Sequence, residues 1–269
     1  MSRSTERLRQ FFRISGLALH IVVGLTLSGA VFPMLRTAGR QACFRWWSRR
    51  LLRILRVEIR IHGDPDAIPR GQPALLLANH VSWLDVFVVR SAVECRFVAK
   101  SDIRQWPIVG WLVSKQGTVF VERARRRDTA RVNASLESAL LSGEKMVVFP
   151  EGTTTDGAVV KPFHASLLQP VVAVSGWAMP VALRYRYPDG RRNDQAAYTG
   201  DLSLWDSAKQ IAAQRYLVAE IFFLPPEQAV GQHRRELAAS TGRAVAEALS
   251  LPPPDKARGT AADPPDAAP

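Results

Sequence analysis

The sequence predicts an α/β fold, in which helices flank a mixed, mostly parallel sheet behind an N-terminal membrane-associated helical segment. Two observations lead to this prediction. After residue 56, short apolar and β-branched runs alternate with stretches of helical periodicity, which is typical of strands joined by crossover helices. Before residue 56, a long apolar stretch is followed by one rich in arginine. The length of 269 residues suffices for one substantial core and a membrane-facing element.

Residues 1–56 are expected to form a membrane anchor and a basic amphipathic helix. The apolar segment 14–35 has roughly the 20 residues that a spanning helix needs. A signal peptide would have a shorter apolar core and a small-residue cleavage site in place of the arginines that follow here. The heavier arginine cluster after the segment predicts that the rest of the chain lies on the cytoplasmic side of a bacterial-type inner membrane. Arginines at both ends also allow a helix that enters one leaflet without crossing.

The formal net charge of +12 implies an anionic partner, either a nucleic acid or a membrane surface. Eight arginines between residues 36 and 60 are interleaved with aromatic and aliphatic residues directly after the apolar segment, which favours the membrane and argues against nucleic acid. Cys43 and Cys95 are too few for a disulfide framework or a cysteine-based zinc site. The chain also has no His-Glu-x-x-His motif, so no metal site is predicted.

One α/β domain is expected over residues 57–250, followed by a disordered tail over 251–269 that is rich in Pro, Asp and Ala. Strands are predicted over 57–62, 74–78, 96–99, 118–121, 145–149, 170–174, 180–185 and 217–224. Helices are predicted over 83–93, 108–114, 125–141 and 227–249. The polar, turn-rich segment 186–210 is expected to be a loop or an insertion.

The most informative segment is 79–85, Asn-His-Val-Ser-Trp-Leu-Asp, which directly follows an apolar strand. It places His80 and Asp85 where a strand ends, and open α/β sheets carry their chemistry at that edge. Ser82 and Asp85 also have the spacing of a helix capping box, so Asp85 could simply satisfy a helix N-terminus and His80 could be a surface residue. A turn there can equally fold the imidazole onto the carboxylate, which gives a general base for a hydroxyl. Because the chain has no Gly-x-Ser-x-Gly elbow, that hydroxyl would belong to a substrate.

A second segment begins at Gly117 and runs through a short strand to Glu122 and Arg123. The two charged residues can form a surface ion pair, which contributes little to stability. Arg123 can instead provide a guanidinium fork for a phosphate or carboxylate at the same sheet edge.

A third segment, 149–157, runs from a buried strand into a turn rich in Gly and Thr. It can be an ordinary loop in which Thr and Asp side chains bond the local backbone. Its backbone N–H groups could also surround an anion, with Lys161 and His164 adding charge nearby.

Together these segments resemble the signature of the glycerolipid (lysophospholipid) acyltransferase family, typified by 1-acyl-sn-glycerol-3-phosphate acyltransferases. The His-x-x-x-x-Asp block of that family matches 80–85, the Gly-x-x-x-x-Glu-Arg block matches 117–123, and Phe-Pro-Glu-Gly-Thr matches 149–153. A fourth, apolar block with a central proline matches around Pro180. The resemblance covers residues 57–225, with the blocks in the family's order, and identifies 57–250 as an acyltransferase domain.

The resemblance implies that His80 takes the proton from a lysolipid hydroxyl, whose oxygen attacks a thioester, while Asp85 orients the histidine. It implies that Arg123 and the 151–153 turn hold the polar head of the acceptor. The residues that it assigns to substrate binding are Lys100, Gly117, Glu122, Arg123, Glu151, Gly152, Thr153 and Lys161. The implied partners are membrane lipids and a co-substrate, acyl-CoA or acyl carrier protein, with no further cofactor and no nucleic acid.

The residue after Glu-Gly-Thr bears on the acceptor. Members of the family that acylate lysophosphatidate usually have an arginine there, whereas this chain has Thr154. The variant is similar to members that acylate lyso-ornithine lipid, although Lys161 could replace the missing charge. Lysophosphatidate is ranked first because it is the commonest acceptor of the family, and lyso-ornithine lipid second. The rival hypothesis of another class is a non-catalytic protein that binds membrane surfaces, against which the intact His80 and Asp85 argue.

Overall fold

A computed structural model describes residues 3–106, 108–115, 117–121 and 126–254 of the chain. Its strands are β1 (Val57–His62), β2 (Ala74–Ala78), β3 (Arg96–Lys100), β4 (Val119–Val121), β5 (Lys145–Val148), β6 (Trp177–Arg186), β7 (Leu217–Phe223) and β8 (Glu227–Gln228). Its α-helices are α1 (Arg3–Thr26), α2 (Thr37–Ile54), α3 (Leu84–Ala92), α4 (Val109–Lys115), α5 (Arg126–Leu141), α6 (Gln169–Ala173), α7 (Leu204–Ala213) and α8 (Arg234–Ala248).

The strands form one sheet in the order β1-β7-β6-β2-β5-β3-β4, with β8 added at one end of β6. Strand β6 is antiparallel to β7 and β8, and the other neighbouring pairs are parallel. All five residues of the central strand β2, Ala-Leu-Leu-Leu-Ala, are buried because both of its faces are covered. The prediction of a mixed, mostly parallel sheet flanked by helices is therefore confirmed.

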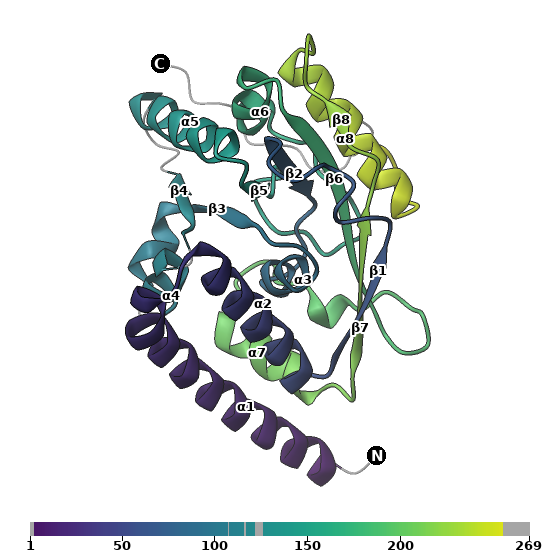
Figure 1. Ribbon diagram of the computed structural model, residues 1–269. Helices are drawn as coiled ribbons and strands as arrows, with labels where there is room; N and C mark the ends of the chain where they lie inside the picture. The colour runs from purple at the N-terminus through teal and green to yellow at the C-terminus, as the bar shows by residue number, and fades with distance from the viewer. Residues whose placement is uncertain (1–2, 107, 116, 122–125, 255–269) are drawn as a thin grey trace, which may run out of the picture.

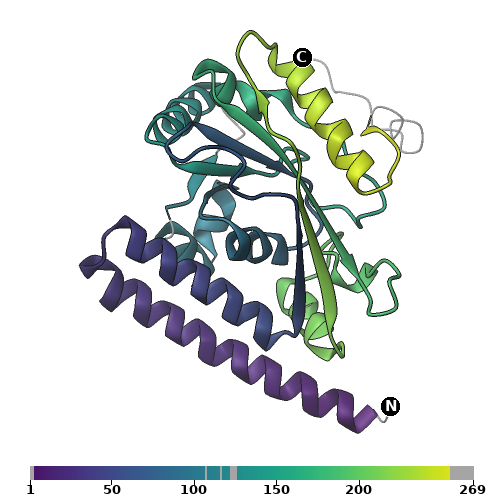
Figure 2. The ribbon, with the colours of Figure 1, turned by 45° about the vertical axis from the view of Figure 1, so that its right-hand side comes forward.

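Helices cover the sheet on both faces, and each face has its own apolar core (Figure 1). Helices α2, α3 and α7 pack over one face, with α1 outside them, and α5, α6 and α8 pack over the other (Figure 2). The alternation along β2 divides its side chains between the two cores: Leu76 faces α2 and α3, whereas Leu75 and Leu77 face α5 and α8.

Three predicted elements differ from the structure. The predicted strand 170–174 is helix α6, because Pro170 has the fixed φ that suits a first helical turn and lacks the N–H that a sheet needs. The polar segment 186–210 contains the start of α7, whose N-cap Ser203 accepts a hydrogen bond from Asp206 N. The predicted helix 227–249 begins only at Arg234, because its first residues pair with β6 as β8.

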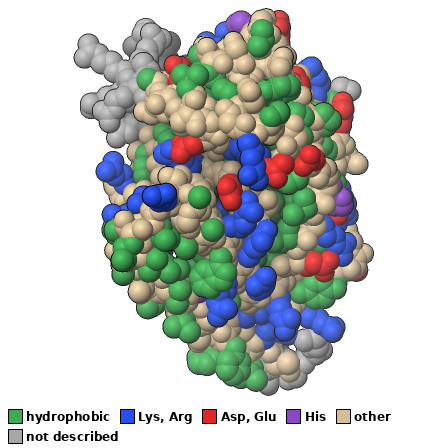
Figure 3. Space-filling model, viewed as in Figure 1, with side chains coloured by type: hydrophobic (Ala, Val, Ile, Leu, Met, Phe, Trp, Pro, Cys, Tyr) green, Lys and Arg blue, Asp and Glu red, His purple; other side chains and the backbone are tan. Residues whose placement is uncertain are grey.

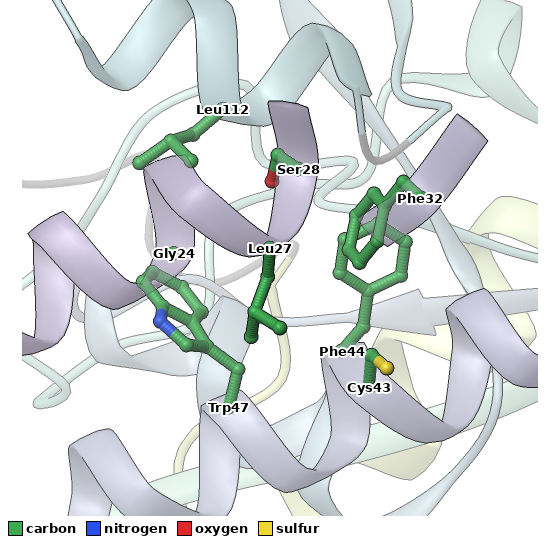
Figure 4. Close-up of a pocket in the computed structure, with 8 residues that line it drawn as sticks. All are labelled: Gly24, Leu27, Ser28, Phe32, Cys43, Phe44, Trp47 and Leu112. Atoms are coloured by element: carbon green, nitrogen blue, oxygen red, sulfur yellow. The ribbon is translucent and has the colours of Figure 1, made fainter. Parts of the chain in front are cut away.

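The two N-terminal helices lie side by side and antiparallel (Figure 2). The His20 and Trp47 rings are stacked, and the Trp47 indole N–H donates to the His20 carbonyl at 3.1 Å. Gly24 allows this approach, since an added Cβ there would lie 2.9 Å from the indole nitrogen. Beside this contact, the end of α1 and the helical turns after it (Leu27–Met34) line an apolar cavity of about 10 Å³ with α2 and α4 (Figure 4), too small for more than one water.

Residue 56, where a domain boundary is expected, lies between helix α2 and strand β1. The last turns of α2 bury Leu51, Leu52 and Leu55 in the same core as α3 and β7, so α2 packs as part of the α/β domain. The expected tail lies almost entirely outside the described residues.

Candidate active site

The site begins where β2 ends, at Asn79. Its side chain accepts a hydrogen bond from Leu183 N at 2.7 Å and donates one to Leu183 O at 2.9 Å. The amide thus extends the pairing of β2 with β6 by one step after the backbone leaves the sheet, since Ala78 is the last residue in register. The clamp fixes the point at which the chain turns toward α3, and it holds His80 at the carboxyl end of the sheet.

His80 and Asp85 are in contact, as their spacing predicts. The Nδ1 atom of His80 lies 2.8 Å from Oδ2 of Asp85, and the Asp85 side chain is completely buried whereas that of His80 is 22% exposed. Because an ionised carboxylate only accepts hydrogen bonds, this contact puts the imidazole proton on Nδ1. The other nitrogen, Nε2, is then the atom that can accept a proton from a hydroxyl.

Asp85 also bonds the backbone at the start of helix α3, in addition to its contact with His80. Its Oδ2 accepts the backbone N–H groups of Val81 and Ser82 at 2.7 and 2.9 Å. The Ser82 hydroxyl accepts more weakly from Leu84 N at 3.4 Å, one residue earlier than a capping box requires. Asp85 lies in the first turn of α3, and the N–H groups of Val81 and Ser82 before this helix hold its carboxylate in place for the histidine.

Tyr185 on β6 is a member of the site that sequence analysis missed. Its hydroxyl donates to Oδ1 of Asp85 at 2.6 Å, and the residue is only 2% exposed. Burial and the adjacent Asp85 charge raise the pKa of Tyr185 well above its ordinary value. A tyrosine that alternates with the apolar residues Val181 and Leu183 is the signal that was available, because a buried hydroxyl requires a partner.

The loop after β5 covers the imidazole. The ring of Phe149 stacks on that of His80, with centroids 4.0 Å apart and planes 15° apart. Thr155 N donates to the His80 carbonyl at 2.8 Å. One face of the imidazole is therefore packed against an aromatic ring, which limits the ring's rotation.

Glu151, expected to bind substrate, is buried beneath the site and bonded to backbone. Its Oε1 accepts His80 N at 2.8 Å and its Oε2 accepts Lys161 N at 3.0 Å. Burial raises the pKa of Glu151 to about 7, although these two N–H donors act in the opposite direction. In this structure both oxygens hold the protein's own loops together, and Glu151 thereby fixes the His80 backbone.

Thr154 holds a third loop beside the site. Its hydroxyl donates to the carbonyl of Tyr198, and Tyr198 N donates to the Val81 carbonyl at 2.8 Å. The segment between β6 and α7 is thus tied to both motif loops at the end of the sheet. Thr154 therefore has a structural partner where an arginine would present a charge.

The remaining predicted residues are only partly placed. Glu122 and Arg123 lie outside the described residues, and Lys100 is the last residue of β3. Gly117 adopts a positive φ of 71°, and its carbonyl accepts Arg96 Nε at 2.6 Å. Gly152 also has a positive φ, of 74°, in the turn after Glu151. Thr153 and Lys161 are exposed on the same loop.

Among the described residues, no group of three or more His, Cys, Asp and Glu side chains could hold a metal ion. The arrangement instead offers one oriented imidazole at the carboxyl ends of parallel strands. Such a group can remove a proton from a bound hydroxyl and return it to a leaving group.

Comparisons with known proteins agree with this chemistry. A family model described as Acyltransferase matches residues 58–184. The lyso-ornithine lipid O-acyltransferase of Pseudomonas aeruginosa is 35% identical over 249 residues, which cover 90% of this chain and 94% of that protein. The 1-acyl-sn-glycerol-3-phosphate acyltransferase of Neisseria gonorrhoeae is 34% identical over 161 residues, covering 57% and 63%.

A solved structure has the same fold. The crystal structure of the 1-acyl-sn-glycerophosphate acyltransferase PlsC from Thermotoga maritima superimposes with a TM-score of 0.66 at 18% identity, and the match covers 98% of this chain and all of that one.

Proposed function

Because this chain belongs to the acyltransferase family, we propose that it moves a fatty acyl group from a thioester to the free hydroxyl of a lysolipid, with His80 as the general base. The observation that carries the proposal is the contact of 2.8 Å between His80 Nδ1 and Asp85 Oδ2 at the carboxyl end of β2. This contact places the imidazole proton on Nδ1. Nε2 then carries no proton and is the basic atom of the imidazole.

The proposed reaction transfers the acyl group directly from one substrate to the other. Nε2 of His80 takes the hydroxyl proton as the lysolipid oxygen attacks the thioester carbonyl, and Asp85 stabilises the imidazolium that forms. The tetrahedral intermediate then expels the thiolate, which takes the same proton from Nε2, so an ester and a free thiol result. The thioester is that of acyl-CoA or acyl carrier protein. No covalent enzyme intermediate is needed, so much of the rate comes from holding both substrates in place.

We propose lyso-ornithine lipid as the acceptor. Relatives named for this acceptor support it, among them the Pseudomonas aeruginosa protein and, at 33% identity over 80% of this chain and 76% of its own length, that of Rhizobium meliloti. Thr154 supports it too, because its hydroxyl is bonded to the Tyr198 carbonyl and adds no cation for a phosphomonoester. Lyso-ornithine lipid is thus placed before lysophosphatidate, which reverses the ranking from the sequence alone.

Lysophosphatidate is the second candidate. It is supported by the relatives named 1-acyl-sn-glycerol-3-phosphate acyltransferase and by the exposed Lys161 on the loop that carries Glu151. An ammonium group in that position could take over part of the role of the missing arginine.

We propose that α1 and α2 hold the protein on a membrane. By length and composition, the helical stretch Thr5–Met34 could cross a bilayer, and 17% of its most apolar window is buried. Figure 3 shows hydrophobic side chains over α1 beside a band of Lys and Arg side chains over α2. The exposed arginines of this region are Arg36, Arg40, Arg49, Arg50, Arg53 and Arg56. Such a pairing suits the boundary between acyl chains and anionic headgroups.

The start of α1 is also tied to the domain, which favours a helix lying in one leaflet. The Arg13 guanidinium donates to the carbonyls of Ala212 and Arg215 at 3.1 and 2.8 Å, at the end of α7. Gln10 donates to Lys209 O at 2.9 Å. A helix fixed along the domain in this way enters the membrane from one side, and we place the domain on the cytoplasmic side, where thioester donors are made.

The test is acyl transfer by the purified full chain in detergent. Acyl-CoA, or acyl carrier protein as donor, is offered with lyso-ornithine lipid, lysophosphatidate, lysophosphatidylethanolamine or lysophosphatidylcholine. Ester formation on lyso-ornithine lipid supports the proposal, and transfer to lysophosphatidate alone supports the second candidate. Absence of transfer to every acceptor from either donor would overturn both and leave the non-catalytic membrane-binding protein as the better explanation.

A further inference from the structure

We propose that Tyr185 is a positioning residue for the reaction, acting through Asp85 on His80. This inference rests on the proposed function, because it assigns a role within the same site. It starts from the observation that Asp85 accepts four hydrogen bonds from the described residues and that one comes from a side chain distant in sequence.

The four donors divide unequally between the two carboxylate oxygens. Oδ2 receives His80 Nδ1 and the backbone N–H groups of Val81 and Ser82, whereas the donor to Oδ1 is the Tyr185 hydroxyl. Rotation of the carboxylate about its Cβ–Cγ bond would move both oxygens, so donors on either oxygen oppose it. The bond of 2.6 Å from the Tyr185 hydroxyl holds the carboxylate at Oδ1 as well, and this second point of attachment keeps the direction from Oδ2 to the imidazole.

Tyr185 is itself held rigidly. The residues Met179, Val181, Leu183 and Tyr185 alternate along β6 and all enter the core that lies beneath α3. Leu183 is clamped by Asn79 through two hydrogen bonds, so β6 is fixed to the segment before His80 just two residues from Tyr185. The chain from Asn79 to Asp85 is thereby bonded to β6 at both of its ends.

The hydroxyl of Tyr185 remains a donor at any pH at which the protein works. It is buried beside a carboxylate, so loss of its proton would place two negative charges in contact. It therefore cannot act as a base, and it lies on the opposite side of Asp85 from the oxygen that holds His80. Its effect on the reaction is to hold the carboxylate, which in turn holds the imidazole tautomer.

The chain offers a matched control two residues further along. Tyr187 makes the same kind of bond, from its hydroxyl to Oδ1 of Asp194 at 3.0 Å, but on the exposed segment after β6. Tyr185→Phe and Tyr187→Phe each remove one hydroxyl that donates to an aspartate, and only the first touches the site.

The experiment is steady-state acyl transfer by the full-length variants under conditions that saturate both substrates. Tyr185→Phe is expected to lower kcat about 10- to 100-fold, the range for one hydrogen bond to a buried charge, with KM for acceptor and donor within about twofold of wild type. Tyr187→Phe is expected to match wild type. An unchanged kcat, or a raised KM at unchanged kcat, would overturn the proposal. In an Asp85→Asn background, Tyr185→Phe is expected to lower kcat little further. If the double variant instead loses the product of the two single losses in kcat, the result would count against the proposal.

A second readout does not depend on activity. The proton on His80 Nδ1 gives a low-field resonance in proton NMR of the full chain in detergent, assigned by its disappearance in His80→Ala. In Tyr185→Phe this resonance is expected to shift or broaden by exchange, and in Tyr187→Phe to stay in place. An unmoved resonance in Tyr185→Phe would overturn the role of Tyr185. If wild type transfers no acyl group, the proposed function fails, and the resonance still decides whether Tyr185 positions the pair.

Discussion

Tyr185 and Asp85 lie 100 residues apart in the chain and share a buried hydrogen bond of 2.6 Å that ties strand β6 to the first turn of α3. On the same carboxylate, the other oxygen contacts His80. His80, the candidate base, is therefore supported by strand β6, which comes much later in the chain. The catalytic segment depends on the whole fold for its geometry, and the predictions below test separate parts of that support.

The first prediction concerns the orientation of His80. Asp85→Asn replaces a carboxylate that accepts from His80 Nδ1 with an amide whose nitrogen can only donate, so the imidazole can take the wrong tautomer. We expect kcat to fall on the order of 10³-fold or more, with the protein still folded. Initial rates and a thermal unfolding curve measured on one preparation separate the two effects. A variant that keeps a tenth or more of wild-type kcat would show that Asp85 is only a helix cap.

The second prediction concerns the clamp between β2 and β6. Asn79→Ala leaves the N–H and the carbonyl of Leu183 unpaired in a buried site, which should lower the free energy of unfolding by about 2–4 kcal/mol. Ser203→Ala removes an exposed N-cap bond, together with the bond from the same hydroxyl to the Asp206 carboxylate, and serves as a comparison with an expected cost of about 1 kcal/mol. Denaturant titration measures both. Equal losses in the free energy of unfolding for the two variants would contradict a stabilising role for the two bonds between Asn79 and Leu183.

The third prediction concerns pH and Glu151. Its pKa is raised from 4.5 to about 7 in the folded protein, so between these values the folded state binds more protons than the unfolded state. Stability should therefore fall as pH rises through this window, and the Glu151 contribution to that fall is roughly 3 kcal/mol. The quantity to measure is the free energy of unfolding at several pH values between 4 and 8.

Glu151→Gln supplies the control for this slope, because the amide does not titrate. The variant should be less stable at pH 5, since its NH₂ group cannot accept one of the two N–H donors, from His80 and Lys161. Its stability should decline less than that of wild type as pH rises. Parallel curves for the two proteins would contradict the raised pKa.

The fourth prediction concerns the acceptor. Thr154→Arg adds a guanidinium beside the site and should shift the ratio of transfer rates toward lysophosphatidate over lyso-ornithine lipid by about tenfold, the effect of one charge-assisted hydrogen bond. Thr154→Val removes the same bond to the Tyr198 carbonyl without adding charge, and its ratio should stay near that of wild type. Equal ratios in the Arg and Val variants would contradict a role for charge at this position.

The fifth prediction concerns the membrane surface. Phe11 and Phe12 on α1 are each 65% exposed. Changing both to Ser should lower binding to vesicles of phosphatidylethanolamine and phosphatidylglycerol at least about tenfold, because two aromatic side chains no longer leave water. Val230, 59% exposed before α8, provides the control Val230→Ser, which should bind like wild type. Equal loss in both variants, measured by sedimentation, would place the membrane surface elsewhere.

The features that the sequence could predict are local ones. The buried run 74–78 and the cap spacing of Ser82 and Asp85 place a histidine at a strand end, and the expected contact with Asp85 is present. The alternation of strand-like runs with helical stretches was enough to predict the fold class, and the order and spacing of the motif blocks carried the family resemblance. The roles of the individual site residues remain predictions.

The features that escaped sequence analysis are non-local or depend on short segments. The contact of Asn79 with β6 follows from a strand order that places β2 beside β6, where Asn79 and Leu183 are 104 residues apart, and no local pattern encodes that pairing. Helix α7 is short and begins inside a segment whose polar, turn-forming residues predicted a loop, although its own apolar residues recur with helical spacing. The run 170–174 is β-branched, but tertiary packing and Pro170 at its first turn make it helical.

The most direct test of the central claim is the initial rate of acyl transfer from acyl-CoA, or from acyl carrier protein, to lyso-ornithine lipid and to lysophosphatidate, measured for wild type and His80→Ala. The variant removes only the imidazole that Asp85 orients. We predict transfer to lyso-ornithine lipid by wild type and a loss of at least about 10³-fold in His80→Ala, with unchanged binding to vesicles. Transfer that persists at a similar rate in His80→Ala would contradict the assignment of His80 as the general base.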